Sequence, residues 1–273
     1  MKSIRVEWMK TRSTRTWWLL ALAAVTFVAL IGSVVARNVT ASPMEAVTHL
    51  AEGQLHLAET PLHYLYSFAA RSGYVFPFLF GALLVTNEYR YRTISQSLLL
   101  TPTRRAFMAG KLSVAAASGA VLGILCAGIG ALCTAAMLSS QGLASELTTA
   151  PIVGILSRTI LVYTLWALIG AALGTLVRHQ AATISTVLIF TLFVEPTLTS
   201  LGNESTSLNT ALKFLPGAAS LSLAWPPTGS TARGVGQAAE SLGWWQGGVI
   251  LLAYASASAA LGYLVRLRRE DIT

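Results

Sequence analysis

Six segments of about 20 predominantly apolar residues dominate this sequence. A helix rises 1.5 Å per residue, so about 20 residues cross the hydrocarbon core of a bilayer. Only 11% of the 273 residues are charged, whereas a soluble domain carries about 25%. The sequence therefore predicts an all-α integral membrane protein with one transmembrane domain over residues 1–273. Its six spans are expected at about 17–36, 66–86, 112–138, 152–177, 181–200 and 243–265.

Basic residues gather on one side of the predicted membrane. With six crossings, both termini, residues 87–111 and Arg178 lie on the same side of the membrane. These segments hold 14 of the 19 basic and 4 of the 11 acidic residues. Because basic loops stay on the cytoplasmic side, both termini are expected there, in the plasma membrane of a bacterium. Anionic lipid headgroups are then the expected counter-surface, and nucleic acid is not an expected partner.

Residues 1–16 and 201–242 are the two flanking regions with a pattern of their own. In residues 1–16, basic residues alternate with Ile4 and Trp8, which predicts an interfacial amphipathic helix. The long outer loop 201–242, before the last span, has an apolar centre that is too short to cross the membrane twice. It either dips partway into the outer leaflet as a re-entrant segment or stays outside it.

Histidines 49, 56 and 63 recur every seven residues in the other long outer loop, residues 37–65. This spacing places them on one face of a helix. Successive members of the row are then about 10.5 Å apart along the axis, too far to share one metal ion. A solvated helix face is therefore favoured over a metal site. Cys126 and Cys133 have the same spacing inside one span, which predicts two free side chains rather than a disulfide.

Small residues four apart occur in three predicted helices. They form the pairs Gly119 and Gly123, Gly170 and Gly174, and Gly243 and Gly247. Such pairs allow helix backbones to approach closely in a membrane. The contact they predict lies either within one chain or between two copies.

Residues 87–111 form the long basic stretch between the second and third spans, with five basic residues and one acid, Glu88. Thr93 to Leu100 is expected to form a short helix that Pro102 ends. Its mixed apolar and polar side chains are typical of a helix that docks in a groove of another protein. A helix lying on the lipid surface without a protein partner is the alternative.

The motif in this stretch resembles that of the permease subunits of type-2 ABC exporters. That pattern is an E-Y-R, often followed by G-T, then a short helix, a P-x-x-R step and a G-K that opens the third helix. Arg92 stands where many relatives have glycine. The matching residues are Glu88, Tyr89, Arg90, Thr93, Pro102, Arg105, Gly110 and Lys111.

The resemblance implies a coupling helix at residues 93–101, held in a groove of a separate ABC ATPase subunit. Two such ATPases, carrying ATP and magnesium, would work with two permeases, identical or paralogous. The permease itself would bind no cofactor and hold no metal or catalytic residue. The implied coupling residues are Glu88, Tyr89, Arg90, Thr93, Ile94, Gln96, Ser97, Leu98, Pro102, Arg105 and Lys111.

The function expected from this resemblance is export of a hydrophobic or amphipathic cargo, such as a drug, an antibiotic peptide or a lipid. The sequence has no G-x-x-x-x-G-K-[ST] phosphate loop and no H-E-x-x-H motif, so ATP hydrolysis or proteolysis by this chain is not expected. Two alternatives stay open. A secondary transporter would carry inverted repeats and broken helices, and a non-transporting scaffold or sensor subunit would work without an ATPase.

Three charged residues interrupt the predicted spans: Arg71, Arg158 and Glu195. Counted along ideal helices from the cytoplasmic side, all three lie in the outer part of the bilayer. Charges at that depth are costly unless they are paired or reach a wet cavity. We expect Glu195 to pair with Arg71 or Arg158 on the translocation path. Alternatively, Glu195 and the following proline simply mark the end of the fifth helix.

Overall fold

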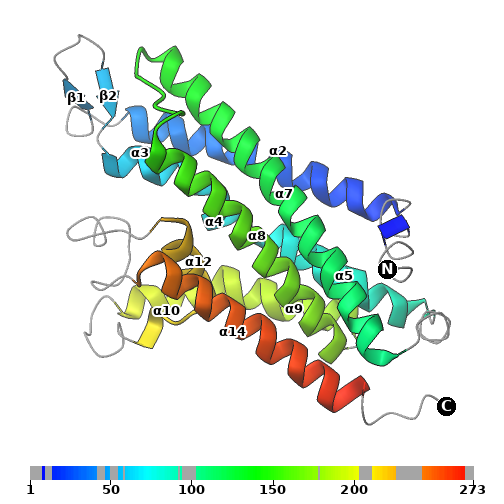
Figure 1. Cartoon of the computed structure of the whole chain (residues 1–273). Coiled ribbons are helices and arrows are strands. Elements are labelled where there is room, and N and C mark those ends of the chain that lie inside the picture. The colour runs from blue at the N-terminus through cyan, green and yellow to red at the C-terminus, as the bar shows by residue number, and fades with distance from the viewer. Residues whose placement is uncertain are drawn as a thin grey trace.

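The fold is a bundle of long helices, here seen in a computed structural model (Figure 1). It describes residues 8–9, 14–41, 47–49, 55–57, 59–91, 93, 103–177, 179–202, 211–225 and 242–267. The long helices are α2 (Arg15–Ala41), α5 (Val75–Arg90), α7 (Arg104–Ser140), α8 (Ala150–Leu176), α9 (Gln180–Ile189) and α14 (Trp244–Gly262). Shorter elements are strands β1 (Val47–His49) and β2 (Leu55–Leu57), helices α3 (Glu59–Tyr66), α4 (Phe68–Ser72), α10 (Glu195–Gly202) and α12 (Pro216–Ala224), and π-helical turns η1 (Phe190–Val194) and η2 (Tyr263–Leu267).

Five helical stretches in the described part of the chain are long and apolar enough to cross a membrane. They are Arg15–Thr40, Arg104–Ser140, Ala150–Leu176, Gln180–Leu198 and Trp244–Val265. They match the first, third, fourth, fifth and sixth predicted spans, with longer ends on the first and third. The protein is therefore an all-α membrane protein, apart from one short β-hairpin.

The second predicted span, 66–86, is divided between α4 and α5 instead of forming one helix. Pro77 explains the break, because it has no N–H to donate to the Gly73 carbonyl one turn earlier. That carbonyl instead accepts a hydrogen bond of 3.2 Å from the N–H of Phe76, which is three residues later in the chain rather than four. Helical hydrogen bonds continue from α3 into α4. The N–H of Ser67 bonds the His63 carbonyl at 2.9 Å, and the N–H of Arg71 bonds the Ser67 carbonyl at 3.1 Å.

Helix α8 is the centre of the bundle, with α5 and α7 packed closely against it. A Cβ built on Gly170 would lie 2.1 Å from the Phe78 carbonyl oxygen of α5. A Cβ on Gly119 of α7 would lie 2.8 Å from the Tyr163 carbonyl oxygen of α8. Two of the three small-residue pairs are therefore used for packing within the chain, as is Gly247 of the third, which touches α12.

The prediction that three histidines lie on one face of a helix is wrong. His49 lies on β1 and the backbone of His56 pairs with Thr48 in an antiparallel hairpin, so only His63 is on a helix, α3. The sequence between residues 47 and 57 explains the difference. It begins with two β-branched residues, Val47 and Thr48, and contains a glycine, all of which favour strand or turn over helix.

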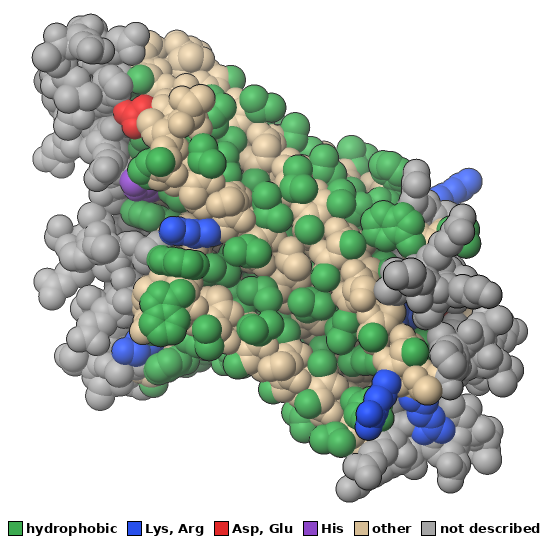
Figure 2. All heavy atoms as spheres, in the orientation of Figure 1, with side chains coloured by type: hydrophobic (Ala, Val, Ile, Leu, Met, Phe, Trp, Pro, Cys, Tyr) green, Lys and Arg blue, Asp and Glu red, His purple; other side chains and the backbone are tan. Residues whose placement is uncertain are grey.

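The outer surfaces of the long helices are apolar. Large hydrophobic side chains are exposed along α2, around η1 and along α14; examples are Leu22, Phe193 and Leu252. Figure 2 shows hydrophobic side chains spread across the middle of one face, with Lys and Arg side chains toward its two ends. An apolar belt between charged ends is the surface expected of a protein surrounded by lipid.

One end of the bundle brings together the parts of the chain that flank residues 92–102. The start of α2, the end of α5, the start of α7 and the end of α14 all lie there (Figure 1). The β-hairpin, α10 and α12 lie at the opposite end. The segments predicted on one side of the membrane therefore lie at one end of the bundle, and which end faces the cytoplasm stays a prediction. The predicted amphipathic helix, residues 1–16, falls largely outside the described residues.

Candidate functional site

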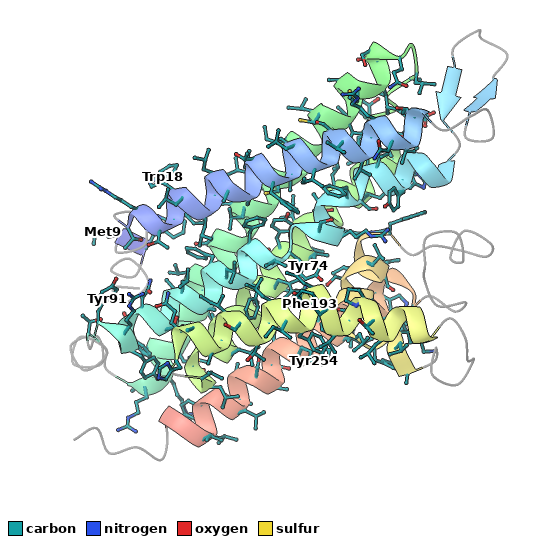
Figure 3. The ribbon with its side chains drawn as sticks, turned by 180° about the vertical axis from the view of Figure 1, so that it is seen from behind. Met9, Trp18, Tyr74, Tyr91, Phe193 and Tyr254 are labelled. Atoms are coloured by element: carbon teal, nitrogen blue, oxygen red, sulfur yellow. The ribbon has the colours of Figure 1, made fainter. Side chains whose placement is uncertain are left out.

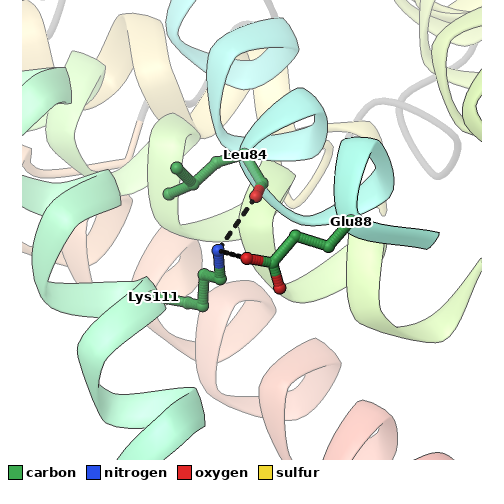
Figure 4. A network of polar contacts seen from close by, with 3 residues as sticks. All are labelled: Leu84, Glu88 and Lys111. Carbon is green, nitrogen blue, oxygen red and sulfur yellow. Dashed lines mark hydrogen bonds and ion pairs between the residues drawn. The ribbon is translucent and has the colours of Figure 1, made fainter. Parts of the chain in front are cut away.

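The candidate site is a buried ion pair between the last turn of α5 and the second turn of α7. Lys111 Nζ lies 2.8 Å from Glu88 Oε1 and donates a second hydrogen bond, of 3.3 Å, to the Leu84 carbonyl (Figure 4). The side chains of Lys111 and Glu88 are only 2% and 9% exposed. A charged pair that is removed from water in this way depends on both partners, because either charge alone would be costly to bury.

The start of α7 is fixed by a side-chain cap. The Thr103 hydroxyl accepts a 3.1 Å hydrogen bond from the N–H of Ala106, which satisfies one of the free N–H groups of the first helical turn. Gly110, next to Lys111, is buried. The cap therefore sets where α7 begins, and Lys111 follows two turns later, facing α5.

Two further polar links join this end of the bundle to the later spans. Arg90 Nη1 donates to the side-chain oxygen of Gln180, at 3.1 Å, at the start of α9. Arg105 Nε donates to the Tyr263 hydroxyl, at 3.2 Å, at the end of α14. Both links are exposed and individually weak. Together with the buried pair they connect α5, α7, α9 and α14 on either side of residues 92–102.

The structure places several of the predicted coupling residues at this junction. Tyr89 packs on a small apolar cluster that includes Val85 and Ala115, and the N–H of Thr93 bonds the Glu88 carbonyl at 3.0 Å. Glu88 itself is buried beside Lys111. The predicted coupling helix lies outside the described residues beyond Thr93. Ile94, Gln96, Ser97 and Leu98 of that helix, and Pro102 after it, therefore lie outside the described residues.

The three intramembrane charges lie in different settings. The Arg71 guanidinium stands 4.9 Å above the Tyr64 ring, and that of Arg158 stands 4.9 Å above the Trp244 ring. Both contacts have cation–π geometry. Glu195 is 6% exposed and accepts a 3.0 Å hydrogen bond from the N–H of Ala218. Each charge therefore has a described contact of its own, while the predicted pairing of Glu195 with an arginine remains a prediction.

A polar and aromatic cluster near Glu195 was not foreseen. Tyr74 stacks on Trp166 with ring centroids 4.5 Å apart, and Trp166 Nε1 donates a 2.6 Å bond to the Ser220 hydroxyl of α12. Figure 3 shows Tyr74 in the interior between helices, whereas Phe193 and Tyr254 lie on helices nearer the surface. The only sequence signal was the apolar centre of the loop 201–242, which contains α12.

A comparison with protein-family models matches residues 3–194 to the ABC-2 family transporter protein family. The match covers more than half of the chain, including the junction of α5 and α7. No curated protein matches the sequence. The family consists of membrane components of ABC transporters, which associate with a separate ABC ATPase subunit. By this match, and by its apolar helices, the chain belongs to the ABC-2 transporter family of membrane proteins.

Proposed function

We propose that this protein is the permease subunit of an ATP-driven exporter. It crosses the plasma membrane of a bacterium six times, with α4 and α5 together forming the second crossing and both termini in the cytoplasm. It works with a second permease, identical or paralogous, and with two ABC ATPase subunits that carry ATP and magnesium. The cargo is a hydrophobic or amphipathic molecule, such as a drug, an antibiotic peptide or a lipid.

The buried pair of Glu88 and Lys111 is the observation that carries this proposal. It ties the last turn of α5 to the first part of α7, the two helices on either side of residues 92–102. Because the end of α5 is joined to the start of α7, we expect residues 92–102 to move together with both helices. A force on residues 92–102 is therefore passed to α5 and α7, and through Arg90 and Arg105 to α9 and α14.

Residues 93–101 act as the coupling helix in this proposal. Their side chains are a mixture of apolar and polar residues, as in helices that dock in a groove of a partner. Closure of the two ATPases around ATP would move this helix and tilt the helices attached to it. The cargo path would then open outward between the two permeases, lined by their second and fifth spans.

Copurification with the ATPase subunit tests the proposal. Leu98→Asp would place a charge in the docking groove, at a cost of several kcal/mol if unpaired. We expect normal amounts of permease in the membrane, loss of ATPase association and loss of export. Leu98→Met, which keeps volume and apolar character, serves as the control and should retain both. A Leu98→Asp variant that still copurifies with the ATPase would contradict the docking role.

A further inference from the structure

Glu195 binds the beginning of a helix that follows it by more than 20 residues. Its Oε1 accepts the N–H of Ala218 at 3.0 Å. Ala218 lies in the first turn of α12, where Pro216 begins the helix and Leu215 precedes it with extended backbone. The first N–H groups of a helix lack partners within the helix and carry partial positive charge. A carboxylate at this point therefore meets both a hydrogen-bond donor and a favourable dipole.

Gly217 leaves the space that this contact needs. A Cβ built on Gly217 would lie 2.4 Å from Glu195 Oε1, 2.5 Å from Oε2 and 2.6 Å from the carboxyl carbon. These separations are far below van der Waals contact, so a side chain at position 217 would displace the carboxylate. The fit between Glu195 and α12 therefore depends on a glycine.

The rest of α12 is fixed to other helices. Ser220 accepts the hydrogen bond from Trp166 of α8. On the far side, a Cβ on Gly247 of α14 would lie 2.4 Å from the Ala219 carbonyl oxygen. Helix α12 is thus held by α8 and α14, and Glu195 joins it to the fifth span.

The fifth span is otherwise loosely packed where it carries Glu195. The three preceding side chains, Leu192, Phe193 and Val194, are 58%, 68% and 37% exposed, whereas Glu195 is 6% exposed. The π-helical turn η1 ends immediately before Glu195. Such a turn contains an extra residue, which rotates the following side chains relative to a regular α-helix. Across this turn Thr191 and Glu195 are both buried, while the three side chains between them face outward.

We propose that Glu195 is a positioning residue that holds the fifth span against α12, and so keeps the outer end of the bundle closed between transport cycles. This rests on the proposed function, in which the fifth span lines the cargo path. The closed state is held where the Glu195 carboxylate meets the first turn of α12, on a helix whose neighbouring side chains are exposed. Breaking that contact frees the outer half of the fifth span and leaves α12 attached to α8 and α14.

A cysteine reporter on the fifth span tests this proposal. The parent protein is the full chain with Cys126→Ala, Cys133→Ala and Thr191→Cys. Thr191 is 5% exposed and precedes Glu195 by four residues. The rate at which a membrane-impermeant maleimide labels position 191 is measured on purified permease in lipid nanodiscs, without an ATPase. Glu195→Ala is expected to raise this rate about twofold to thirtyfold, the range for loss of a carboxylate at a helix N-terminus.

Gly217→Ala provides the sharper comparison. It should raise labelling about as much as Glu195→Ala, because its methyl group displaces the carboxylate, and it should add nothing in a protein that already carries Glu195→Ala. Gly248→Ala is the matched control. Its Cβ would only touch Leu223, at 3.5 Å, and labelling should stay at the parent rate. Parent-like rates for Glu195→Ala and Gly217→Ala, or effects that multiply in the double variant, would overturn the proposal.

Two further measurements separate a positioning role from a merely structural one. Glu195→Gln keeps the volume and one accepting oxygen but not the charge, so it should fold and label at an intermediate rate. Parent-like labelling of a folded Glu195→Gln protein would count against the role of the charge. In the complex with its ATPase, ATP and vanadate should raise labelling of the parent and leave Glu195→Ala unchanged. Failure of the ATPase to associate would contradict the proposed function. The labelling in nanodiscs needs no ATPase, so it would still test the contact between Glu195 and α12.

Discussion

Lys111 Nζ lies 2.8 Å from Glu88 Oε1, although the two residues are 23 positions apart in sequence. The pair closes the ends of α5 and α7 onto each other and buries both charges. Its burial changes what a substitution at Glu88 should do. An exposed pair is worth about 0–1 kcal/mol, whereas removing one member of a buried pair costs about 3–5 kcal/mol.

We therefore expect Glu88→Ala to destabilise the protein strongly, because it leaves the Lys111 ammonium buried without its carboxylate. The melting temperature of purified permease, followed by size-exclusion chromatography after heating, measures the loss. The double variant Glu88→Leu/Lys111→Leu should recover much of it, since an apolar pair has no charge to desolvate. Arg90→Ala, at an exposed link, is the control and should shift the melting temperature little. Equal effects of Glu88→Ala and Arg90→Ala would show that the buried pair is not stabilising.

The close approach of α5 and α8 predicts a second large effect. Gly81→Ala would place a Cβ 2.0 Å from the Ala167 carbonyl oxygen, where only backbone could yield. Overpacking of this kind typically costs about 1–3 kcal/mol or more, so we expect less folded protein in the membrane. Gly154→Ala on α8, which has nothing within 4 Å, is the control. Its yield should match the wild type, and normal yield of Gly81→Ala would contradict the packing.

The bond between Trp166 and Ser220 predicts a smaller, non-additive effect. Ser220→Ala leaves the buried indole N–H without its acceptor, which costs about 1–3 kcal/mol. Trp166→Phe removes the donor as well as part of the stack on Tyr74. Because both variants break the same bond, the double variant should be less destabilised than the sum of the two. Thermal unfolding of the four proteins measures this, and strict additivity would argue against the bond.

The exposed link between Arg105 and Tyr263 predicts little loss of stability. Tyr263→Phe removes only the hydroxyl that accepts the Arg105 bond, so stability should fall by less than about 1 kcal/mol. If the link helps to pass motion from α7 to α14, export per ATP hydrolysed should fall more than stability does. Reconstituted vesicles measure both rates. Unchanged export per ATP would show that the hydrogen bond between Arg105 and Tyr263 does not pass motion from α7 to α14.

The long spans were predictable from sequence because length and apolar composition depend on the bilayer alone. Helices α2, α7 and α8 each contain an apolar stretch long enough to cross the bilayer, and each forms one helix in the structure. The division of the second span was also readable in principle, because Pro77 removes one backbone donor. The prediction instead followed hydropathy, which is insensitive to a missing hydrogen bond.

The contacts of the site were not predictable in the same way. Glu88 and Lys111 were both recognised from the motif, but their partnership depends on how α5 and α7 face each other. Glu195 was expected to seek an arginine, and its described contact is a backbone N–H of α12. Every residue except proline has a backbone N–H, so the sequence does not show which one a carboxylate will bond. The small residue beside it, Gly217, was visible only as a turn signal next to Pro216.

The length of α7 gives the bundle a mechanical property. Its 37 residues form a rod of about 55 Å, well beyond the roughly 30 Å of hydrocarbon that it crosses. A tilt of about 5° about one end displaces the other end by about 5 Å, which is close to one helical turn. Because Lys111 ties α7 to α5 near the start of α7, a small tilt of α7 and its packed neighbours at that end becomes a displacement of several ångströms at the other end.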